Sequence, residues 1–290
     1  MRIKNEVRWP SASSAGLVWL GQAGFWIETG QHRILVDPYL SDSLEQKYKG
    51  APNDYHRMMP APCAIEDVPR PDVILITHAH TDHMDPDTLA PLYARYPDVP
   101  FVVPRSKLEE AQNRIGKRAK LIGADTDETI TPVDGLTLTI FPAAHEERTY
   151  DDNGRDVFLG FGIESAGLKM LHPGDTIPFP ELSERISKFA PDIALLPVNG
   201  RDKIRLEQGI PGNMSLAEAI DLGRNIPVIV PHHWGMFSFN TIDPELIAAA
   251  ANECTTSQIV LPVCGKLLRI HPANAETRIR VSVSVSWSQT

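Results

Sequence analysis

The most constraining feature of the sequence is a short apolar run that leads directly into a histidine cluster. Residues 73–77 read VILIT, and residues 78–83, which follow without a break, read HAHTDH. An apolar run this short is typical of a β-strand buried on both faces, because a buried helix needs more residues. Imidazole is the commonest nitrogen ligand of divalent metals, and a turn after a rigid strand can direct several side chains to one point. The pattern therefore predicts a metal site at the end of a buried strand.

The order of residues inside HAHTDH indicates two neighbouring metal ions. His78 and His80 alternate along the chain, so both rings can approach one ion. Asp82 and His83 lie past the bend and can face a second ion. Four ligands do not complete two catalytic sites, since each usually takes three protein ligands. The remaining ligands must therefore come from other parts of the chain.

Three other segments place histidine or aspartate directly after an expected strand. His145 follows a strand of alternating apolar and polar residues, and Asp175 follows a strand and a glycine turn. His232 and His233 both follow another short apolar run, and the pattern leaves open which of the two is the ligand. Functional residues of α/β folds gather in loops at strand ends. We therefore expect all three segments to contribute to the cluster.

Turn-forming residues divide the rest of the chain into short elements. The sequence has 25 prolines and 19 glycines, which disfavours a helical bundle. Residues 17–28 and 33–36 are predicted to form an early β-hairpin, and residues 41–70 a long loop with short helical pieces. Further strands are expected at residues 101–103, 136–141, 158–164, 168–171, 193–197 and 279–287, and helices at residues 87–96, 106–115, 180–189, 215–224 and 244–252. This mixture predicts a single α/β unit over residues 1–290, with helices outside two packed sheets.

Charge and cysteine content narrow the partners and the compartment. The formal net charge of −9 disfavours binding to nucleic acid or to anionic membranes. No stretch approaches the roughly 18 apolar residues of a membrane span, and no export signal is recognisable. The three cysteines lack CxxC spacing and favour reduced thiols. We expect a cytoplasmic protein that acts on a small molecule; the alternating strand near the C-terminus offers an edge that a second copy could cover, as in a homo-oligomer.

These motifs together resemble the metallo-β-lactamase fold superfamily, whose hallmark is HxHxDH followed by a distant histidine, a strand-end aspartate and a final histidine. Within the superfamily, the sequence is similar to the branch typified by L-ascorbate-6-phosphate lactonase. The similarity is carried by residues 19–26, 57–60, 77–85, 174–175, 214–223 and 231–233. It implies a four-layer αββα sandwich, in which two mixed sheets pack face to face with helices outside. That branch lacks a counterpart of His145, so its presence points to more general hydrolases of the superfamily.

The resemblance also implies a ligand set for two divalent ions. One ion takes His78, His80 and His145, the other takes Asp82, His83 and the final histidine, and Asp175 bridges them. Relatives carry Pro-x-His at the last position, which selects His233 over His232. Two ions about 3.5–4 Å apart can hold a hydroxide at neutral pH and polarise the bond it attacks. Asp82 and Asp175 are then the catalytic carboxylates, and zinc, manganese or iron suits such ligands.

The lead hypothesis is metal-dependent hydrolysis of a small ester or lactone, including a phosphorylated sugar lactone. Arg148 and Arg201 lie near expected strand ends and could clamp an anionic group, and Trp234 could contact the substrate. The alternative is a phosphodiesterase or nuclease, which the negative charge disfavours. A non-enzymatic metal-binding module is a third hypothesis, but structural zinc sites usually have four protein ligands that are often thiolates.

Several further residues are expected to support the site or to lie outside it. Asp37 and Asp85 are candidates to accept hydrogen bonds from ligating imidazoles, because such rings normally donate their second N–H. His172 lies inside an apolar strand and is expected to be a buried, hydrogen-bonded imidazole. The other histidines have no companions and are expected at the surface; they are His32, His56 and His271.

Overall fold

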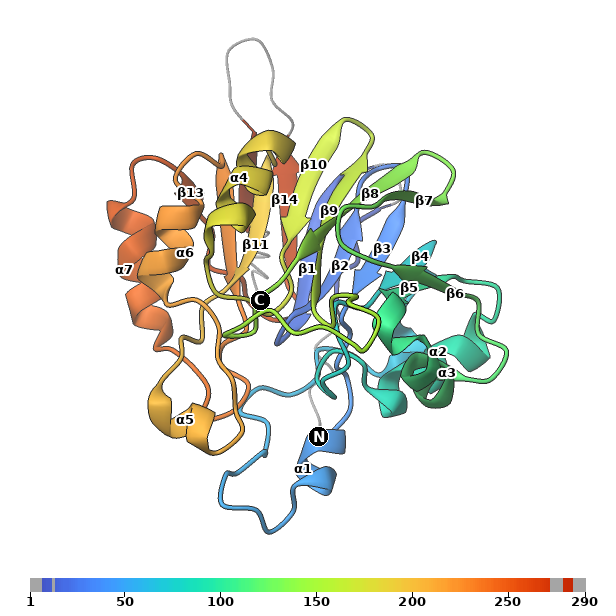
Figure 1. The fold of residues 1–290 in the computed structure, drawn as a ribbon. Helices are drawn as coiled ribbons and strands as arrows, with labels where there is room; N and C mark the ends of the chain where they lie inside the picture. Colours follow the sequence, from blue (N-terminus) through green and yellow to red (C-terminus); the bar gives the residue numbers. More distant parts are fainter. Residues whose placement is uncertain (1–6, 12–13, 272–278, 284–290) are drawn as a thin grey trace, which may run out of the picture.

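The computed structural model of the protein describes residues 7–11, 14–271 and 279–283. In this part of the chain two β-sheets pack face to face, and helices cover their outer sides (Figure 1). The first sheet has the strand order β15-β14-β1-β2-β3-β4-β5-β6, and the second has the order β13-β12-β11-β10-β9-β8-β7. Each sheet contains both parallel and antiparallel pairs. The predicted α/β sandwich of two mixed sheets with helices outside is therefore confirmed.

The elements are short, as the many turn-forming residues predict. The strands of the first sheet are Gly16–Gly21 (β1), Gly24–Glu28 (β2), Arg33–Val36 (β3), Val73–Leu75 (β4), Phe101–Pro104 (β5), Leu121–Ala124 (β6), Leu267–His271 (β14) and Arg280–Val283 (β15). Those of the second are Thr129–Val133 (β7), Leu136–Pro142 (β8), Leu159–Ser165 (β9), Leu168–His172 (β10), Ile193–Pro197 (β11), Val228–His232 (β12) and Gln258–Ile259 (β13). The α-helices are Ser43–Lys47 (α1), Pro86–Arg95 (α2), Leu108–Ile115 (α3), Pro180–Phe189 (α4), Lys203–Glu207 (α5), Leu216–Leu222 (α6) and Pro244–Glu253 (α7). Two single turns of 3₁₀-helix are Ile65–Asp67 (η1) and Arg105–Lys107 (η2).

Alternation along the strands explains how the layers pack. In β1, Leu17 and Trp19 join the apolar cluster that lies between the two sheets, whereas Val18 and Leu20 join the cluster beneath α2 and α3. Successive side chains of a strand point to opposite faces, so one strand supplies both cores. On the other side of the sandwich, α4, α6 and α7 contact β8, β12 and β13 (Figure 1). Both faces of both sheets are thereby covered.

Some expected elements differ from the structure. Residues 17–28 were expected as one strand, but they form β1 and β2, an antiparallel pair joined by a tight turn. Gln22 in that turn has a φ of 51° and Gly21 a φ of 94°, so the chain reverses where one extended run was expected. The sequence analysis also missed β6, β7, α5, β13 and β14, which are short or lack clear alternation. The strand expected at residues 279–287 is present as the edge strand β15, and residues 284–290 lie outside the described residues.

Three further features of the fold bear on the sequence predictions. The thiols of Cys63, Cys254 and Cys264 are free. Over the part of the chain that the structure describes, no helix combines the length and the apolar character needed to cross a bilayer. The long loop between β3 and β4 contains α1 and η1, as the prediction of short helical pieces stated.

Gly174, immediately before Asp175, is expected to be intolerant of substitution. Its φ is +67°, and a Cβ there would lie 2.4 Å from the carbonyl oxygen of Leu159. The Gly174→Ala variant should lose roughly 2–4 kcal/mol of unfolding free energy, from backbone strain and overpacking together. Gly167→Ala is a matched control, because Gly167 has a φ of +76° but nothing within 4 Å. It should lose only about 1 kcal/mol. Equal losses in urea unfolding of the two variants would contradict the steric argument.

Candidate metal centre

The histidines and aspartates that follow several strands converge at one edge of the two sheets. His78 follows β4 in the first sheet, whereas His145, Asp175 and His233 follow β8, β10 and β12 in the second. All four are buried, with exposed fractions of 0%, 7%, 3% and 2%. Residues far apart in the sequence are therefore brought to one place by the packing of the two sheets.

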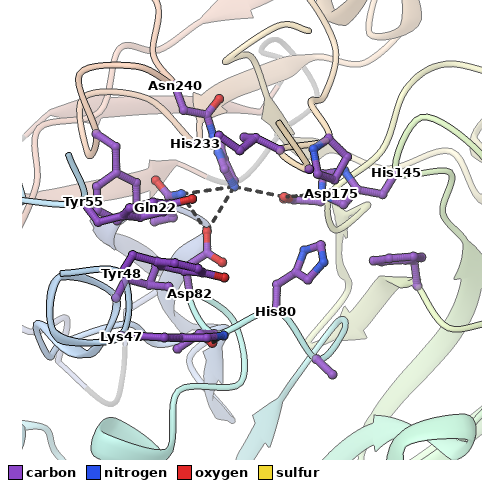
Figure 2. A pocket seen from close by; sticks show the side chains of 18 of the residues that line it. Gln22, Lys47, Tyr48, Tyr55, His80, Asp82, His145, Asp175, His233 and Asn240 are labelled. Atoms are coloured by element: carbon purple, nitrogen blue, oxygen red, sulfur yellow. Dashed lines mark hydrogen bonds and ion pairs between the residues drawn. The ribbon is translucent and has the colours of Figure 1, made fainter. Parts of the chain in front are cut away.

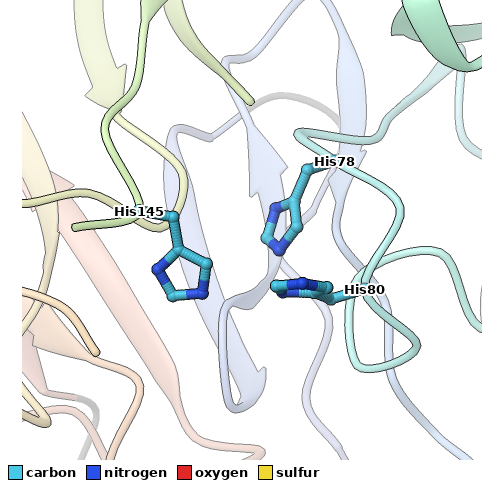
Figure 3. A group of neighbouring side chains, drawn as sticks. All are labelled: His78, His80 and His145. Atoms are coloured by element: carbon cyan, nitrogen blue, oxygen red, sulfur yellow. The ribbon is translucent and has the colours of Figure 1, made fainter. Parts of the chain in front are cut away.

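The first group of possible ligands consists of His78, His80 and His145 (Figure 3). Each offers one ring nitrogen, and these three atoms lie within 4.8 Å of one another. Ligands of one ion at about 2.0–2.2 Å can be separated by up to roughly 4 Å, so small inward shifts would close the group. His78 is buried and His80 is exposed on the cavity side. The grouping is the one that the resemblance implies.

The second group consists of Asp82, His83 and His233, again with ligand atoms within 4.8 Å of one another. The turn that follows His80 brings Asp82 and His83 back toward His78: the backbone N–H groups of His83 and Met84 both donate to the carbonyl oxygen of His80, at 3.1 and 2.8 Å. This hydrogen-bonded turn explains how one hexapeptide supplies ligand atoms to two groups.

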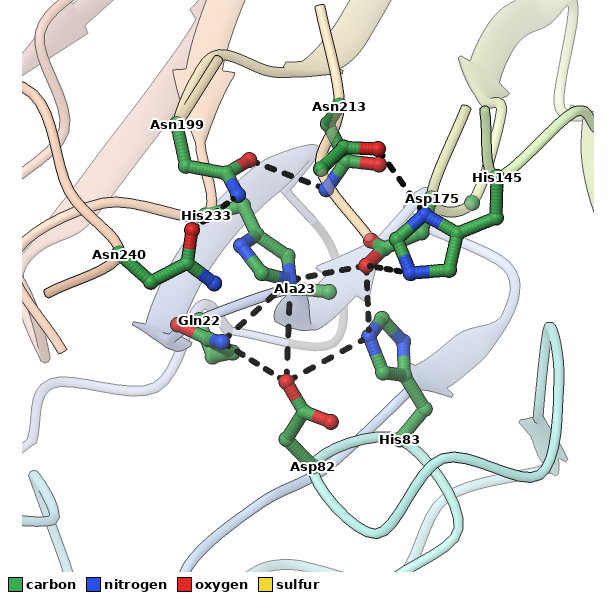
Figure 4. Close-up of polar contacts among 12 residues, drawn as sticks. Gln22, Ala23, Asp82, His83, His145, Asp175, Asn199, Asn213, His233 and Asn240 are labelled. Atoms are coloured by element: carbon green, nitrogen blue, oxygen red, sulfur yellow. Dashed lines mark hydrogen bonds and ion pairs between the residues drawn. The ribbon is translucent and has the colours of Figure 1, made fainter. Parts of the chain in front are cut away.

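Asp175 lies between the two groups (Figure 4). Its Oδ2 atom is 3.0 Å from Nε2 of His233, 3.4 Å from Nε2 of His83 and 3.7 Å from Nε2 of His145. His78, His83 and Asp175 also form a third group of possible ligands, which draws on both of the others. The position of this carboxylate is the one expected of a ligand shared by two ions.

Buried hydrogen bonds fix the orientation of the His78 and His83 rings. His83 donates from Nδ1 to Oδ2 of Asp37 at 2.7 Å. The hydroxyl of Thr77 also donates to this carboxylate, at 2.6 Å, so its oxygen is left to accept from Nδ1 of His78 at 3.0 Å. A neutral ring that donates from Nδ1 has its Nε2 lone pair available for a metal. Asp37 therefore supports both rings, directly for His83 and through Thr77 for His78.

His145 is oriented in the same way by the backbone. Its Nδ1 donates to the carbonyl oxygen of Gly212 at 3.1 Å, which leaves Nε2 facing Asp175. The N–H of Gly212 donates in turn to Glu146 at 2.8 Å, so the loop that holds His145 is itself held. The loop between α5 and α6 thus positions a ligand that follows β8.

Burial and neighbouring charges set the protonation of these groups. Burial lowers the pKa of His78 well below its usual value, and lowers that of His145 to about 4. Burial by itself raises the pKa of the Asp175 carboxyl group. The neighbouring His233 and His83 lower it by more, so the pKa of Asp175 lies well below its usual range. For His83, burial is outweighed by Asp175 and two other carboxylates, which raise its pKa well above the usual value. The cluster therefore supplies neutral imidazoles, carboxylates and one imidazole that holds its proton tightly.

The donor set fits divalent cations. Nε2 of His78, Nε2 of His83 and Oδ1 of Asp175 are buried and have no hydrogen-bond partner among the described residues. Buried polar atoms are almost always paired, so unpaired atoms that face one another indicate a ligand. Histidine and carboxylate donors suit zinc, manganese or iron. The described residues thus fit the divalent metal ions that the resemblance implies.

Metal binding to the metal-free protein is expected to release about one proton near pH 7. The raised pKa of His83 means that its Nε2 carries a proton, which a metal must displace, whereas His78 and His145 are already neutral. Because deprotonation of His83 precedes ligation, apparent affinity should rise about tenfold per pH unit until the pH passes the pKa of His83. Calorimetric titrations in two buffers with different ionisation enthalpies measure the released proton. A binding enthalpy that is independent of the buffer would contradict this prediction.

Gln22 is a site residue that the sequence analysis did not identify. Its Nε2 donates to Oδ2 of Asp82 at 2.8 Å and lies 3.3 Å from Nε2 of His233. Its backbone carbonyl accepts a hydrogen bond from the N–H of His233, whose φ is 62°. The turn between β1 and β2 therefore holds two members of the second group. The Gly-Gln-Ala-Gly sequence within an otherwise extended run is the signal that could have revealed this turn.

Asn240 was also missed, and its side-chain amide has a defined orientation. Its Oδ1 accepts from Nη1 of Arg205 at 2.6 Å and from Nδ2 of Asn199 at 2.8 Å. Arginine can only donate, so the amide oxygen must face Arg205 and the NH₂ group must face the opposite way. Asn240 lines the same cavity as His233, and Figure 4 shows its nitrogen directed toward Gln22. A hydrogen-bond donor is thereby presented to the cavity.

The three residues expected to bind substrate are not among the described residues that line this cavity. Arg148 is engaged by Asp156 at 2.8 Å, and Arg201 by Glu218 at 2.7 Å. Trp234 is 9% exposed, and its ring packs against Trp19 with centroids 4.9 Å apart. Trp19 comes from a distant part of the chain, whereas Asp156 and Glu218 are eight and seventeen residues from their arginines.

Asp85 was expected to accept a hydrogen bond from a ligating imidazole, and the structure shows other partners. Among the described residues, its carboxylate makes no hydrogen bond with a histidine. It accepts hydrogen bonds from the hydroxyls of Ser41 and Ser43 at 2.7 and 2.8 Å and caps the N-terminus of α2 through Asp87 N–H. It therefore ties the loop before α1 to α2. A carboxylate at a helix N-terminus is favoured by the exposed N–H groups there.

The two adjacent histidines at the end of β12 have different surroundings. His233 joins the second group, whereas the ring of His232 is buried beside Phe25, with Nε2 3.2 Å from the carbonyl oxygen of Leu195.

His172 is buried as expected, and its Nε2 lies 2.9 Å from the carbonyl oxygen of Ala23. Of the three histidines expected at the surface, His56 and His271 are exposed; His32 is half-buried, with Nδ1 2.7 Å from the Ser165 hydroxyl.

The family profile described as "Beta-lactamase superfamily domain" matches residues 32–234, well over half of the chain. The chain belongs to the β-lactamase superfamily. The matched segment contains Asp37, the HAHTDH hexapeptide, His145, Asp175 and His233. The superfamily named by the sequence resemblance is therefore confirmed.

Individual relatives of this β-lactamase superfamily protein are similar over most of its length. A UPF0173 metal-dependent hydrolase from Methanoculleus marisnigri is 27% identical and covers 89% of this chain and 98% of its own. An N-acyl-phosphatidylethanolamine-hydrolyzing phospholipase D from Caenorhabditis elegans is 24% identical and covers 80% of this chain and 67% of its own. The solved structure of Igni18, a metallo hydrolase from Ignicoccus hospitalis, has a TM-score of 0.67 and 22% identity, and covers 88% of this chain and 97% of its own. The structural likeness supports the fold.

Proposed function

We propose that this metal-dependent hydrolase of the β-lactamase superfamily cleaves a small ester or lactone. The observation that carries the proposal is that His80, Asp82, His145, Asp175 and His233 line one open cavity of about 510 Å³. Cavities of roughly 300–1,000 Å³ suit small molecules. Structural metal sites are usually closed by four protein ligands, whereas ligand atoms on an open cavity wall leave room for substrate.

Different side chains around the cavity would have different roles in such a reaction. His78, His80 and His145 would hold one divalent cation, Asp82, His83 and His233 a second, and Asp175 would bind both. When bound, such cations supply Lewis-acid polarisation of the scissile bond and lower the pKa of a bound water. Asp82, held by Gln22, is placed to accept a proton at Oδ1 or Oδ2. The NH₂ group of Asn240 is placed to donate to an acceptor oxygen of the substrate.

Removal of metal is expected to lower ester and lactone hydrolysis by about 100-fold or more, since Lewis-acid stabilisation contributes several kcal/mol. The protein is treated with EDTA, dialysed and assayed with 4-nitrophenyl acetate and γ-butyrolactone, then reassayed after the return of zinc or manganese. Elemental analysis of the purified protein gives the number and identity of the ions. A fully metallated preparation that hydrolyses no ester or lactone would refute the proposal.

Phosphodiester hydrolysis is the second candidate function. It is supported by the similarity to the Caenorhabditis elegans protein, which is named as a phospholipase D. The same arrangement of carboxylates and imidazoles can serve either reaction, because both require attack on a polarised centre. Bis(4-nitrophenyl) phosphate turned over well above 4-nitrophenyl acetate by the zinc- or manganese-loaded protein would reverse the order of the two candidates. Hydrolysis of a phosphorylated sugar lactone stays a prediction, because none of these assays contains such a substrate.

A further inference from the structure

One side of the cavity is formed by four aromatic side chains, Tyr48, Tyr55, Phe237 and Phe239, which we call the aromatic wall. The rings of Tyr48 and Tyr55 stack with their centroids 4.4 Å apart. Tyr55 also meets Phe239 at 4.8 Å and Phe237 at 5.4 Å, both edge to face. Figure 2 shows the two tyrosines on the side of the cavity opposite His145. The aromatic wall therefore faces the same space as the candidate metal ligands.

The aromatic wall is held together by contacts between two distant segments. The N–H of Met58, just after Tyr55, donates to the carbonyl oxygen of Met236, just before Phe237, at 2.8 Å. Buried Arg57 donates from Nη1 to the carbonyl oxygen of Ser41 at 2.8 Å, which ties the same loop to the chain before α1. A surface that is already arranged binds a ligand without a large ordering cost.

The four rings of the aromatic wall differ in their exposure. Phe237 is 2% exposed and belongs to a small core cluster with Tyr39 and Leu44, whereas Tyr48 is 37% exposed. Phe239 and Tyr55 are half-buried. The inner ring therefore anchors the wall, and the outer rings offer apolar surface to whatever enters the cavity. Burial raises the pKa of Tyr55 to about 12, so its hydroxyl stays neutral at physiological pH.

The cations of the cavity do not form an arginine clamp for a phosphate group. Arg114 is paired with Glu110, and Lys107 lies 3.8 Å from the same carboxylate. Lys47 donates to the hydroxyl of Thr81 at 3.1 Å. The arginines that the sequence analysis proposed as an anion clamp do not line the cavity. Continuous aromatic surface is thus a more distinctive feature of this cavity than fixed positive charge.

We propose, on the basis of the function proposed above, that the aromatic wall binds an apolar, preferably aromatic, substituent of the substrate. The reacting ester or lactone group then lies at the candidate metal ligands while its substituent packs against Tyr48, Tyr55 and Phe239. Aromatic rings favour offset-stacked and edge-to-face contacts with one another, which adds to the gain from burying apolar area. The substrate class is therefore phenyl- or alkyl-substituted esters and lactones, rather than polar sugar lactones.

A binding experiment tests the aromatic wall without relying on turnover. The zinc-loaded protein is titrated calorimetrically with acetate and with phenylacetate, which share a carboxylate and differ by a phenyl ring. Phenylacetate is expected to bind at least about tenfold more tightly to the parent protein. In Phe239→Ala the ratio of the two affinities should fall below about threefold, while Phe239→Leu should keep an intermediate ratio. Because both probes are measured on one preparation, partial loss of metal or of folded protein does not change the ratio.

Two further variants provide a second test and a control for the binding experiment. Tyr48→Ala removes the most exposed ring of the wall and should also lower the ratio, even where Phe239→Ala folds poorly. Tyr150→Ala is the control: Tyr150 is 49% exposed and does not line the cavity, so its removal should leave the ratio unchanged. A parent ratio near one, or a ratio that survives both Phe239→Ala and Tyr48→Ala, would overturn the inference.

Hydrolysis separates this inference from the proposed function. The kcat/KM for γ-phenyl-γ-butyrolactone is expected to exceed that for γ-butyrolactone by about tenfold in the parent protein, and by much less in Tyr48→Ala. Hydrolysis of both lactones at equal kcat/KM would uphold the proposed function and contradict the role of the aromatic wall. Two inert lactones together with a preserved preference for phenylacetate would contradict the lactonase proposal and uphold the aromatic wall as a binding surface.

Discussion

The Asp175→Asn variant is expected to lose at least about 100-fold in metal affinity, more than the loss typical of residues that merely support ligands. Asp175 Oδ2 lies within 3.7 Å of ring nitrogens of three histidines, so this carboxylate is the charge common to both candidate groups. Asparagine keeps the shape but removes the negative charge that balances the cations. Hydrolytic activity is expected to fall by a similar factor, because Asp175 contacts histidines of both candidate groups.

Elemental analysis after dialysis and activity at a saturating metal concentration test this prediction. Asp98→Asn is a suitable control, because Asp98 is an exposed carboxylate that is paired with Arg70 and does not line the cavity. The fold of Asp175→Asn should persist, as thermal unfolding of the metal-free protein can verify. If the variant retains two tightly bound ions, Asp175 does not bridge them.

The Asp37→Asn variant is expected to lower metal affinity by about 10- to 100-fold and the free energy of unfolding by roughly 1–3 kcal/mol. Asp37 is fully buried and accepts three hydrogen bonds, from the N–H and the hydroxyl of Thr77 and from Nδ1 of His83. An asparagine cannot accept all three, because its NH₂ group must face one of the donors. The ring of His83 would lose the partner that leaves its Nε2 free for a metal.

Asp85→Asn is the matched control for this second prediction. Asp85 is also fully buried and accepts several hydroxyl hydrogen bonds, but it contacts no histidine. Its replacement should lower stability by a comparable amount and leave metal affinity within about twofold of the parent, since the capping of α2 and the hydroxyl hydrogen bonds from Ser41 and Ser43 are affected, but no histidine partner is. Equal losses of metal affinity in Asp37→Asn and Asp85→Asn would mean that the effect is general destabilisation and not orientation of His83.

The local sequence was sufficient for the elements that are strongly patterned. The apolar run before His78, the alternation before His145 and the apolar run before His232 all predicted strands that the structure contains. The superfamily could be named because its hallmark hexapeptide is contiguous in sequence. Short pieces such as β13, with two residues, could not be found in this way, because pairing with a neighbouring strand and not their own composition makes them strands.

The chain by itself determined which side chains are able to bind metal, because ligand chemistry and strand-end position are both written in the residues around His78, His145 and Asp175. Tertiary structure decided which of them meet. His232 and His233 are neighbours in sequence, yet one ring enters the core and the other reaches Asp175. Adjacent side chains at the end of a strand point in different directions, and only the packing of the sheets fixes which direction leads to the site.

Partners that come from distant segments were also decided by the tertiary structure. Gln22 reaches Asp82 because a turn in the first sheet lies beside the histidine cluster, and the aromatic wall exists because Tyr55 and Phe237 meet across a long separation in sequence. The pairing of Arg148 with Asp156, eight residues further along the chain, was likewise not evident from the sequence. A side chain's chemistry is local, but its partner depends on the folded path of the whole chain.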